Sequence, residues 1–450
     1  MLRGASSWRP TRRLSSTRPR KLKAVRCLYS FLIRLSSPIA FAVVLWRGLR
    51  NRRYWVGLGE RFGLGAALGA VPTIWVHAVS LGEVTAAAPL VRALRARYPE
   101  IPLVVTTATP TGRARAQALF GESVAVRFVP YDTPGSMRRF LARARPRLAI
   151  IMETELWPNL FNQCRRRGVP ILLANARLSK KSVARYQRFG SLFRDVLSGN
   201  ALVAAQSAED AERFAAVGAE RSRLRVVGNL KFDIVVDAAV IERGRELRSA
   251  CWGPRPVWIA GSTHAGEEDM ALTAHAHLRA KVPDALLLLV PRHPERFQAV
   301  ADLLNRRGFR FERRSSGNPV RPETQVLLVD TVGELATLYA SVDLGFVGGS
   351  LVPVGGHNLL EPAALGVPVI TGPYQSNARE IAKLLLQESA AVQVADAAEL
   401  AGVLEDLLTD AQKRQRIGEN GLHVVAVNRG SLMRLLELIE PLLGTQPAYP

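Results

Sequence analysis

Short apolar runs alternate with longer segments of helical period along this chain from residue 74 onward. Continuous aliphatic runs are typical of strands in parallel sheets, because helices cover such sheets on both faces. In the first half the predicted strands are residues 74–79, 103–107, 124–129, 148–152, 171–174 and 202–205. In the second half they begin at residue 257 and continue at 286–290, 326–329, 344–347, 367–371 and 392–394. The pattern predicts an α/β protein with parallel sheets.

Residues 347–371, VGGSLVPVGGHNLLEPAALGVPVIT, contain the most informative pattern. An apolar strand leads into four glycines, a helix start at Asn358 and a second apolar strand. This order places backbone N–H groups beside a helix N-terminus, where an anion is favoured, and the glycines suit close approach of a phosphate. Glu361 could then bind ribose hydroxyls. The structural alternative is a plain helix cap, with Asn358 as N-cap and Glu361 at the third helical position.

Residues 74–98, IWVHAVSLGEVTAAAPLVRALRARY, have the same order of strand, glycine loop and helix. Two such halves predict two Rossmann-like domains that face one another across a cleft. We place the first domain at residues 54–238 and the second at residues 239–428. A basic head with a membrane-associating helix precedes them at residues 1–53, and a last helix follows at residues 429–450.

Glu83 follows the first predicted strand in the sequence Ser80-Leu81-Gly82-Glu83. This spacing fits a capping box, in which the carboxylate only satisfies a backbone N–H. Gly82, however, leaves the carboxylate open toward the carboxyl end of the strand, where ligands bind in α/β sheets. A carboxylate there could take a proton from an attacking hydroxyl group.

Charged residues also follow other predicted strands. Glu153 and Glu155 follow residues 148–152 and lie beside Trp157, so their proton affinity could be altered, or they could be ordinary surface acids. Arg292 follows residues 286–290 and could pair with a phosphate through two hydrogen bonds. Lys231 lies near the predicted crevice, although a surface lysine is the default interpretation.

The N-terminal region is strongly basic. Residues 1–53 hold 14 of the 61 Lys and Arg residues and no Asp or Glu, and the whole chain has a formal charge of +23. An arginine-rich arm could bind nucleic acid, but the neighbouring apolar residues 28–46 favour another interpretation. They are interrupted by polar residues, so we interpret them as a poor bilayer span and as a helix held at an anionic membrane surface. We therefore expect no nucleic-acid partner.

The remaining composition excludes several classes of protein. With 48% hydrophobic and 22% charged residues the chain is globular rather than disordered. Its three cysteines have no paired spacing, which fits a reducing compartment. The seven histidines lack the spacing of a metal site, no Asp-x-Asp motif occurs, and the acidic residues 267–269 are best interpreted as the first turn of a helix. We expect no metal and no other cofactor.

At these residues the chain resembles the 3-deoxy-D-manno-octulosonic acid (Kdo) transferase family, whose members add Kdo to the lipid A precursor. The resemblance extends from about residue 28 to the last helix. The matching segments are GERFG (59–63), HAVSLGE (77–83), TPTG (109–112), METELWPN (152–159), NARLS (175–179), LKFD (230–233), STHAGEE (262–268), PRHPERF (291–297) and GGHNLLEPA (355–363).

The resemblance implies an inverting glycosyltransferase of the two-domain GT-B type. The donor would be CMP-Kdo and the acceptor lipid IVA, at the cytoplasmic face of the inner membrane. By position Glu83 matches the catalytic base, and Glu153 and Lys231 match residues that act on the transition state. The positions that match CMP contacts are Pro291, Arg292, Val332, Gly333, Glu334, Asn358, Leu359, Leu360 and Glu361. The family does not account for the basic head before about residue 24.

Two other interpretations remain open from the sequence. A GT-B enzyme that uses another activated sugar, such as a UDP-hexosamine transferase or epimerase, would share the fold pattern. A noncatalytic membrane-surface or nucleic-acid-binding protein would use the basic head alone. Binding of CMP rather than UDP distinguishes the first alternative from the Kdo transferase.

Overall fold

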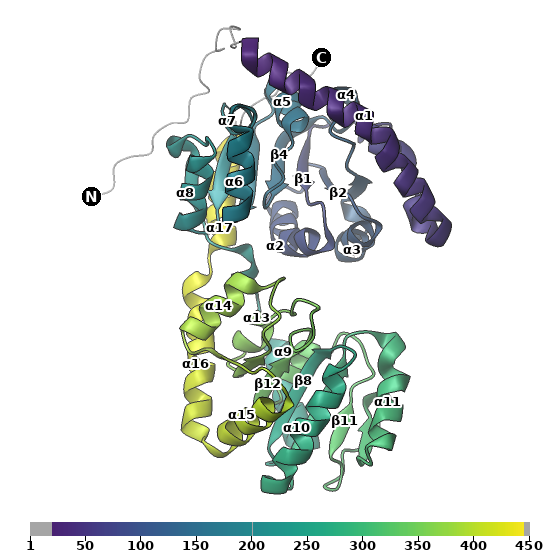
Figure 1. Cartoon of the computed structure of the whole chain (residues 1–450), viewed down its shortest axis with the longest axis vertical. Helices are drawn as coiled ribbons and strands as arrows, with labels where there is room; N and C mark the ends of the chain where they lie inside the picture. The colour runs from purple at the N-terminus through teal and green to yellow at the C-terminus, as the bar shows by residue number, and fades with distance from the viewer. Residues whose placement is uncertain (1–19, 200, 445–450) are drawn as a thin grey trace, which may run out of the picture. The chain divides into compact units, whose positions relative to one another are not determined.

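The computed structural model describes residues 20–199 and 201–444, and the chain divides into two compact units (Figure 1). The first unit comprises Met1–Asp233 and Gly430–Pro450, and the second comprises Ile234–Arg429. The last helix is therefore part of the first unit. Residues 1–19, which hold most of the expected basic head, lie outside the described residues.

The first unit is built on a parallel sheet in the order β3-β2-β1-β4-β5-β6-β7. Each strand is a short apolar run, as expected for strands that helices bury on both faces. The strands are β1 Thr73–His77, β2 Leu103–Thr107, β3 Ala125–Phe128, β4 Pro146–Met152, β5 Ile171–Ala176, β6 Ala201–Ala205 and β7 Leu224–Val226. In the register of the sheet, Trp75 of β1 lies between Val104 of β2 and Ala149 of β4.

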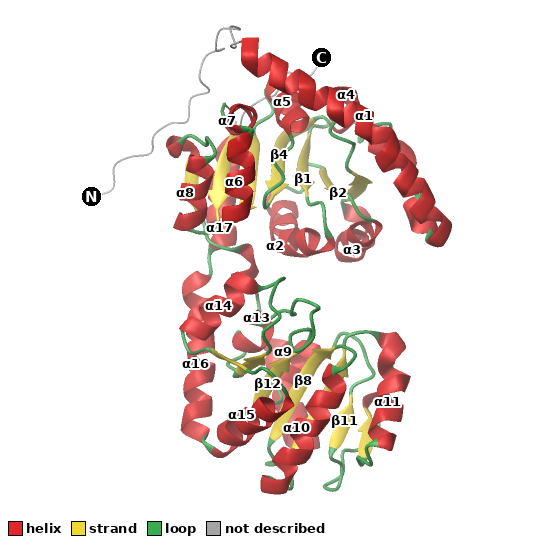
Figure 2. Cartoon of the chain, in the orientation of Figure 1, coloured by secondary structure: helices red, strands yellow, loops and turns green. Residues whose placement is uncertain are grey.

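Helices cover both faces of this sheet (Figure 2). The helices of the first unit are α1 Arg20–Arg50, which packs outside the core layers, α2 Leu81–Arg97, α3 Pro110–Phe120, α4 Pro134–Ala144, α5 Pro158–Arg166, α6 Lys180–Arg188, α7 Gly190–Leu197, α8 Ala208–Ala216 and α17 Ser431–Leu443. Short 3-10 turns link them: η1 Arg52–Tyr54, η2 Leu58–Phe62, η3 Gly121–Ser123, η4 Arg221–Arg223 and η5 Leu230–Phe232.

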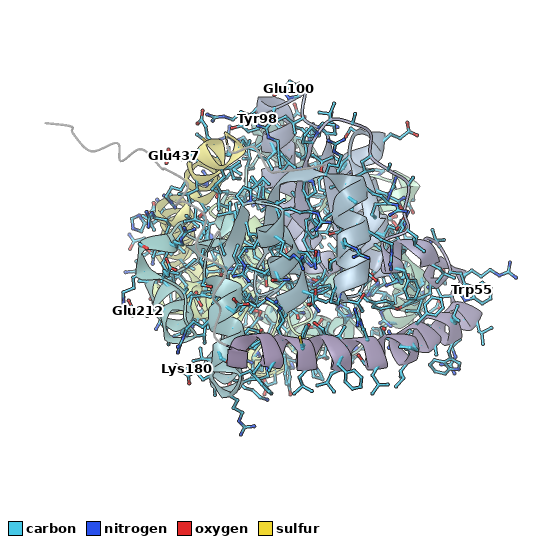
Figure 3. All side chains as sticks on the ribbon, turned by 90° about the horizontal axis from the view of Figure 1, so that it is seen from above. Trp55, Tyr98, Glu100, Lys180, Glu212 and Glu437 are labelled. Carbon is cyan, nitrogen blue, oxygen red and sulfur yellow. The ribbon has the colours of Figure 1, made fainter. Side chains whose placement is uncertain are left out.

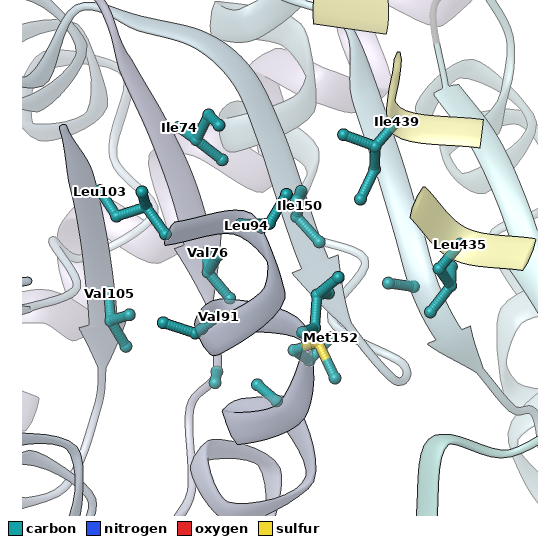
Figure 4. Packing of buried hydrophobic residues seen from close by; sticks show 14 of the residues in the cluster. Ile74, Val76, Val91, Leu94, Leu103, Val105, Ile150, Met152, Leu435 and Ile439 are labelled. Carbon is teal, nitrogen blue, oxygen red and sulfur yellow. The ribbon is translucent and has the colours of Figure 1, made fainter. Parts of the chain in front are cut away.

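The core of the first unit consists of two layers, because successive side chains of a strand point to opposite faces. Ile74 and Val76 of β1 belong to one layer, with α2 and α17, whereas Trp75 belongs to the other layer, with α4 and α5. Figure 4 shows Leu435 and Ile439 of α17 packed beside the side chains of β4. Burial of such an aliphatic side chain stabilises the fold by about 1.5–3 kcal/mol, which explains why the last helix packs onto this unit.

The second unit is built on another parallel sheet, in the order β10-β11-β9-β8-β12-β13-β14. The strands are β8 Val257–Thr263, β9 Leu286–Pro291, β10 Phe311–Arg313, β11 Val326–Leu328, β12 Leu344–Val347, β13 Val369–Thr371 and β14 Ala391–Gln393. The helices are α9 Ala238–Leu247, α10 Glu267–Lys281, α11 Phe297–Arg306, α12 Leu335–Tyr339, α13 Leu360–Ala363, α14 Arg379–Gln387, α15 Ala397–Thr409 and α16 Ala411–Asn428. A π-helical turn, η6 Arg248–Trp252, follows α9, and 3-10 turns occur at η7 Pro294–Arg296 and η8 Arg314–Ser316.

The prediction of two parallel α/β sheets is confirmed, including the strand near residue 392 and a last helix within residues 429–450. The sequence analysis did not predict β7, β10 or α16. The strands β7 and β10 have only three residues each and are at most half-buried, so they lack the apolar run of a central strand.

The helix α1 lies along the first unit, as Figure 3 shows from above. Its inner side makes polar and aromatic contacts: the Arg26 guanidinium donates to Asn162 Oδ1 at 2.7 Å, and Phe41 packs against Phe62 with ring centroids 5.0 Å apart. Large apolar side chains are exposed along the same helix: Leu28, Phe31, Leu32, Leu35, Ile39, Val43, Leu45, Trp46 and Leu49.

Candidate active site

The strand order of the first unit creates a switch point between β1 and β4. The chain passes from β1 to β2 and β3 on one side, and β4 begins the strands on the other side. Ligands bind at the carboxyl ends of the strands at such a point. Since β1 ends at His77 and β4 ends at Met152, the segments 78–83 and 153–157 border it. The predicted residues Glu83 and Glu153 lie in these two segments.

Glu83 lies in the first turn of α2, and 9% of its surface is exposed. Its Oε2 accepts a 2.9 Å hydrogen bond from the backbone N–H of Val79, and its Oε1 accepts one of 2.9 Å from the Ser80 hydroxyl. The Ser80 hydroxyl oxygen accepts the N–H of Glu83 at 3.2 Å. The capping alternative is therefore present, and it fixes the carboxyl group at the edge of the sheet rather than removing it from there.

Burial raises the pKa of Glu83 to about 7, although the hydrogen bonds from Val79 and Ser80 oppose the shift. The charges of Glu155 and Glu153 raise the pKa further. A Cβ added at Gly82 would approach only Ser80 Oγ, at 3.8 Å, so open space borders this turn. A carboxyl group with a pKa near neutral pH, beside open space, has the properties of a general base.

The acidic segment after β4 is held in an unusual conformation. Glu153 has φ 53°, which costs on the order of 1–3 kcal/mol for a residue with a side chain. Its Oε2 accepts a 2.9 Å hydrogen bond from Nε of Arg177. Glu155 Oε2 accepts one of 2.6 Å from the Trp157 indole, and burial raises the pKa of Glu155. The sequence suggested an altered proton affinity for Glu153 and Glu155, and the raised pKa of Glu155 agrees with this suggestion.

The ring of Trp157 packs edge-on against His77, with centroids 5.0 Å apart. His77 is fully buried at the end of β1, and its Nδ1 forms a 2.9 Å hydrogen bond with Thr106 Oγ1. Burial lowers the pKa of His77 to about 3, so its ring is neutral at pH 7. His77 therefore supports the acidic segment by packing and does not offset its negative charge.

Lys231 lies in η5, which packs against α2, the helix that carries Glu83. The N–H of the preceding residue, Leu230, donates a 3.1 Å hydrogen bond to Asn175 Oδ1 at the end of β5. Asn175 is buried and has φ 52°. The structure thus brings the segments of Glu83, Glu153 and Lys231 to the carboxyl edge of one sheet.

Asp132, which the sequence analysis did not identify, fixes the helix that follows the acidic segment. Its carboxylate accepts hydrogen bonds from the N–H groups of Asn159 at 3.0 Å and Leu160 at 2.7 Å, and from the Tyr29 hydroxyl at 2.9 Å. These contacts cap the N-terminus of α5, where an anion is stabilising. Burial raises the pKa of Asp132 to about 7. No local sequence pattern predicts this cap, because Asp132 and its hydrogen-bond partners are far apart in the chain.

The second unit has its own switch point, between β8 and β12. The glycine-rich segment predicted to bind an anion begins directly after β12. The anion found there is the carboxylate of Glu267, which is fully buried. It accepts hydrogen bonds from the N–H groups of His264, Gly349, Ser350 and Leu351, at 2.9, 2.7, 2.9 and 2.9 Å.

The expectation that a phosphate approaches these glycines is therefore wrong for residues 349–351, because a side chain of the protein already fills the nest of N–H groups. The other glycines also face protein atoms. A Cβ at Gly348 would lie 2.6 Å from the Ser262 carbonyl oxygen, and one at Gly356 would lie 2.2 Å from Gln375 Oε1. Their small size serves close packing. Glu267 does begin α10, as expected for the first turn of a helix.

Side chains instead supply positive and polar groups at this edge. Arg292 and His293, which directly follow β9, are exposed. Two further histidines are partly exposed: His264 follows β8, and His357 lies in the loop after β12. Their Nε2 atoms lie 2.8 Å apart. Within the described residues, Arg292 forms no ion pair.

The remaining predicted nucleotide contacts lie after the same strands. Val332 and Gly333 follow β11 and are exposed, and the Glu334 carboxylate accepts hydrogen bonds from Arg314 at 3.2 and 3.3 Å. Asn358 Oδ1 accepts the N–H of Leu360 at 3.2 Å, and its Nδ2 donates to Glu361 Oε1 at 3.0 Å. The cap considered for this segment is therefore not formed as expected: the helix has only four residues, its N-cap is Leu359, and Glu361 is its second residue.

Burial raises the pKa of Glu361, while the Asn358 hydrogen bond and the charge of Arg292 oppose the shift. Pro291 is the last residue of β9. Among residues 20–199 and 201–444, no group of three or more His, Cys, Asp or Glu side chains is arranged to hold a metal ion. The three cysteines are unpaired.

Two family descriptions match the chain, one for each unit. Residues 56–234 match 3-Deoxy-D-manno-octulosonic-acid transferase (kdotransferase), and residues 257–424 match glycosyl transferases group 1.

Individual proteins show the same relationship. The chain is similar to the 3-deoxy-D-manno-octulosonic acid transferase of Haemophilus influenzae, with 43% identity over 423 residues that cover 93% of this chain and 99% of that protein. It is 38% identical to the Bordetella pertussis transferase of the same description over 436 residues, which cover 93% of this chain and 100% of that one. The crystal structure of UDP-GlcNAc 2-epimerase from Neisseria meningitidis bound to UDP-GlcNAc matches with a TM-score of 0.55 and 12% identity, covering 82% of this chain and 100% of that one. At that identity the epimerase shows a common fold alone.

Proposed function

Because the chain belongs to the 3-deoxy-D-manno-octulosonic acid (Kdo) transferase family, we propose that it transfers Kdo from CMP-Kdo to lipid IVA with inversion at the anomeric carbon. Kdo transfer in lipopolysaccharide synthesis is the activity of the family, and the two α/β units have the GT-B-like fold of such enzymes. The identity of the donor, the identity of the acceptor and the stereochemistry of the reaction are the parts that we propose.

In this proposal Glu83 is the general base. Its carboxylate removes the proton from the acceptor hydroxyl as the hydroxyl oxygen attacks the anomeric carbon of Kdo from the face opposite CMP. The bond between that carbon and the phosphate oxygen breaks, and CMP leaves with the electron pair. The observation that carries the assignment is the carboxyl group of Glu83 at the switch point, with a pKa near 7. General base catalysis by a positioned group typically contributes about 10²- to 10⁴-fold in rate.

Other charged residues are assigned to electrostatic stabilisation of the reacting groups. Lys231 and Glu153, in the first unit, are assigned to the stabilisation of the transition state, and Arg292, in the second unit, to the phosphate of CMP. Preorganised charges of this kind are effective because they need no reorientation during the reaction. The remaining contacts to CMP are assigned to Pro291, residues 332–334 and residues 358–361.

We also propose that α1 attaches the protein to the cytoplasmic face of the inner membrane. By length and composition, residues 24–50 could cross a bilayer, since their most apolar 18-residue window has a mean hydropathy of 1.8, which differs from the poor span expected from the sequence. We favour a helix that lies on the surface. Arg26, Tyr29 and Ser30 bind the first unit through hydrogen bonds, while apolar side chains of the same helix remain exposed.

The membrane proposal is tested by flotation with vesicles that contain anionic lipid. A variant with Phe31→Gln, Leu35→Gln and Ile39→Gln removes exposed apolar groups from α1 without touching its polar contacts. We expect the wild-type chain to float and the variant to remain with the soluble fraction. Equal flotation of both proteins would exclude the surface helix as the main attachment.

The alternative, a UDP-hexosamine transferase or epimerase, is not favoured, because the likeness to the epimerase is one of fold and the sequence family is that of Kdo transferases. Mass spectrometry of lipid IVA incubated with the protein and CMP-Kdo tests the proposal. We expect the lipid mass to increase by one or more Kdo units, with equimolar release of CMP. An unchanged lipid mass, together with consumption of a UDP-sugar by the same protein, would exclude it.

A further inference from the structure

Three histidines from separate segments meet at the switch point of the second unit. The rings of His264 and His357 are nearly parallel, at 12°, with centroids 5.0 Å apart. The His293 ring stands edge-on to His264, with centroids 5.2 Å apart. Arg292 lies beside them, since its charge acts on both His264 and His357. The motif segments 262–268, 291–297 and 355–363 each contribute one histidine. The proposed function gives none of these histidines a role.

The position of this cluster matters because the backbone nest nearby is filled. Glu267 accepts the N–H groups of residues 349–351, so a ligand phosphate cannot use these donors. The side-chain donors at the ends of β8 and β9 and in the loop after β12 include Arg292 and the three histidines. An imidazole offers an N–H donor to a phosphate, and it adds a positive charge when it is protonated.

Burial, with the positive charges nearby, lowers the pKa of both histidines of the pair. Burial lowers the pKa of His357 to about 4, with His264, Arg292 and His293 adding repulsion. Burial also lowers the pKa of His264, where Glu267 opposes the shift and His293, Arg292 and Arg296 favour it.

One nearby carboxylate faces the cluster, since Glu295 Oε1 lies 3.8 Å from His293 Nδ1. Three others are engaged elsewhere. Glu267 binds the four N–H groups, Glu268 pairs with Arg296 at 3.0 Å, and Glu361 accepts from Asn358. With neutral rings, the 2.8 Å contact between the two Nε2 atoms is a hydrogen bond in which one ring donates and the other accepts. An arriving dianion would change this balance, because negative charge beside an imidazole raises its pKa.

We propose that His264 and His357 form, with Arg292, a phosphate-binding pair that takes up a proton when the phosphate of the nucleotide binds. This inference rests on the proposed function, since it assumes that the second unit binds CMP. One ring becomes an imidazolium and donates to a phosphate oxygen. In the reaction the phosphate gains a negative charge when the bond to the sugar carbon breaks, and the imidazolium offsets this charge.

Calorimetry on the full-length protein tests the proposal. CMP is titrated at pH 7 to 9 in buffers of different ionisation enthalpy, which gives the number of protons taken up on binding. Since the second pKa of a phosphate monoester is about 6, the ligand itself is mostly a dianion in this range. We expect the wild-type protein to take up a fraction of a proton at pH 7, and both the uptake and the affinity to fall as the pH rises.

His357→Gln and His264→Asn remove the titrating rings but keep polar side chains. We expect each variant to bind CMP roughly 10- to 100-fold more weakly at pH 7, the loss of one charge-assisted hydrogen bond, and to take up far fewer protons. Cytidine, which lacks the phosphate, should bind the variants and the wild-type protein equally, which also shows that the site is folded. His423→Gln, on the exposed side of α16, is the matched control and should change neither quantity.

The outcomes separate the two proposals. If the wild-type protein binds CMP without proton uptake, or if the variants bind CMP as the wild type does, the histidine pair has no such role and the proposed function stands. If the wild-type protein binds no CMP, the proposed donor and the phosphate-binding pair are both excluded.

Discussion

The Tyr29 hydroxyl donates a 2.9 Å hydrogen bond to Oδ2 of Asp132, and this bond connects α1 to the buried cap of α5. The helix α5 begins directly after the acidic segment 153–157. The proposed membrane helix is thus joined by one hydrogen bond to the carboxylate that fixes the segment of Glu153. Ser30 adds a second contact to the same turn, since its hydroxyl donates to Asn159 Oδ1 at 2.9 Å.

Tyr29→Phe removes this donor while Asp132 keeps its two backbone donors. We expect the free energy of unfolding to fall by about 1–2 kcal/mol, because the buried carboxyl group of Asp132 loses a hydrogen bond. Urea unfolding measures the change. Tyr98→Phe is the matched control, because within the described residues the Tyr98 hydroxyl is buried without a hydrogen-bond partner. Equal stability of the Tyr29 and Tyr98 variants would show that the bond to Asp132 contributes nothing.

Glu153 combines a strained backbone with a proposed catalytic role. Glu153→Gly and Glu153→Ala both remove the carboxylate and its pairing with Arg177, but only glycine adopts φ 53° without strain. We expect the glycine variant to be more stable than the alanine variant by about 1 kcal/mol, with Kdo transfer impaired in both. Thermal unfolding and turnover are measured on the same preparations. If the alanine variant is the more stable one, the backbone at residue 153 is not strained in solution.

Glu267→Gln places an amide NH₂ group against N–H donors in the nest of residues 349–351. We expect a loss of about 2–4 kcal/mol in the stability of the second unit, since two of the four N–H donors lose their acceptor oxygen. Asp269→Asn, an exposed acid in the same first helical turn, should change stability by less than about 0.5 kcal/mol. Denaturant unfolding distinguishes the two. A tolerant Glu267→Gln variant would mean that the nest is open to another anion.

The pKa of Glu83 makes stability depend on pH in a defined direction. Because the folded pKa of about 7 lies above the usual value of 4.5, the folded protein binds more protons than the unfolded chain between these values. The contribution of this group to stability is therefore full below about pH 4.5 and is lost as the pH rises through 7. Asp132 acts in the same direction.

Glu83→Gln removes the titration of Glu83 alone. We expect the stability of the variant relative to the wild-type protein to increase by about 2–3 kcal/mol between pH 4.5 and pH 8. Urea unfolding at several pH values measures the difference, and Glu122→Gln, which replaces an exposed acid in η3, should show none. A pH-independent difference would mean that the carboxyl group of Glu83 titrates normally.

The sequence predicted the sheets well, because the central strands are continuous apolar runs that are buried on both faces. It failed at α16, where Gly418 and Gly421 indicate a break in a helix. In the fold these glycines allow close approach: a Cβ at Gly418 would lie 2.1 Å from the carbonyl oxygen of Gly366. Packing with a remote segment, rather than local helix propensity, stabilises this helix.

Site residues were predictable from the sequence where they directly follow a predicted strand. Glu83, Glu153 and Arg292 follow β1, β4 and β9, and the sheet topology brings such strand ends to one edge of each unit. Contacts between remote segments were not predictable. Glu267 binds N–H groups that lie more than 80 residues away in the chain. His264 contacts His357, which lies 93 residues further along the chain.

The pH dependence of Kdo transfer in the wild-type protein and in Glu83→Gln tests the central claim most directly. With Glu83 as the base, kcat/KM of the wild-type protein should rise about tenfold per pH unit below pH 7 and stop rising near pH 7, as an essential base with this pKa loses its proton. The Gln variant keeps an oxygen acceptor for the cap, so it should fold normally and lose about 10²- to 10⁴-fold in kcat. A folded Gln variant with near-normal turnover and the wild-type pH profile would contradict the assignment of Glu83 as the base.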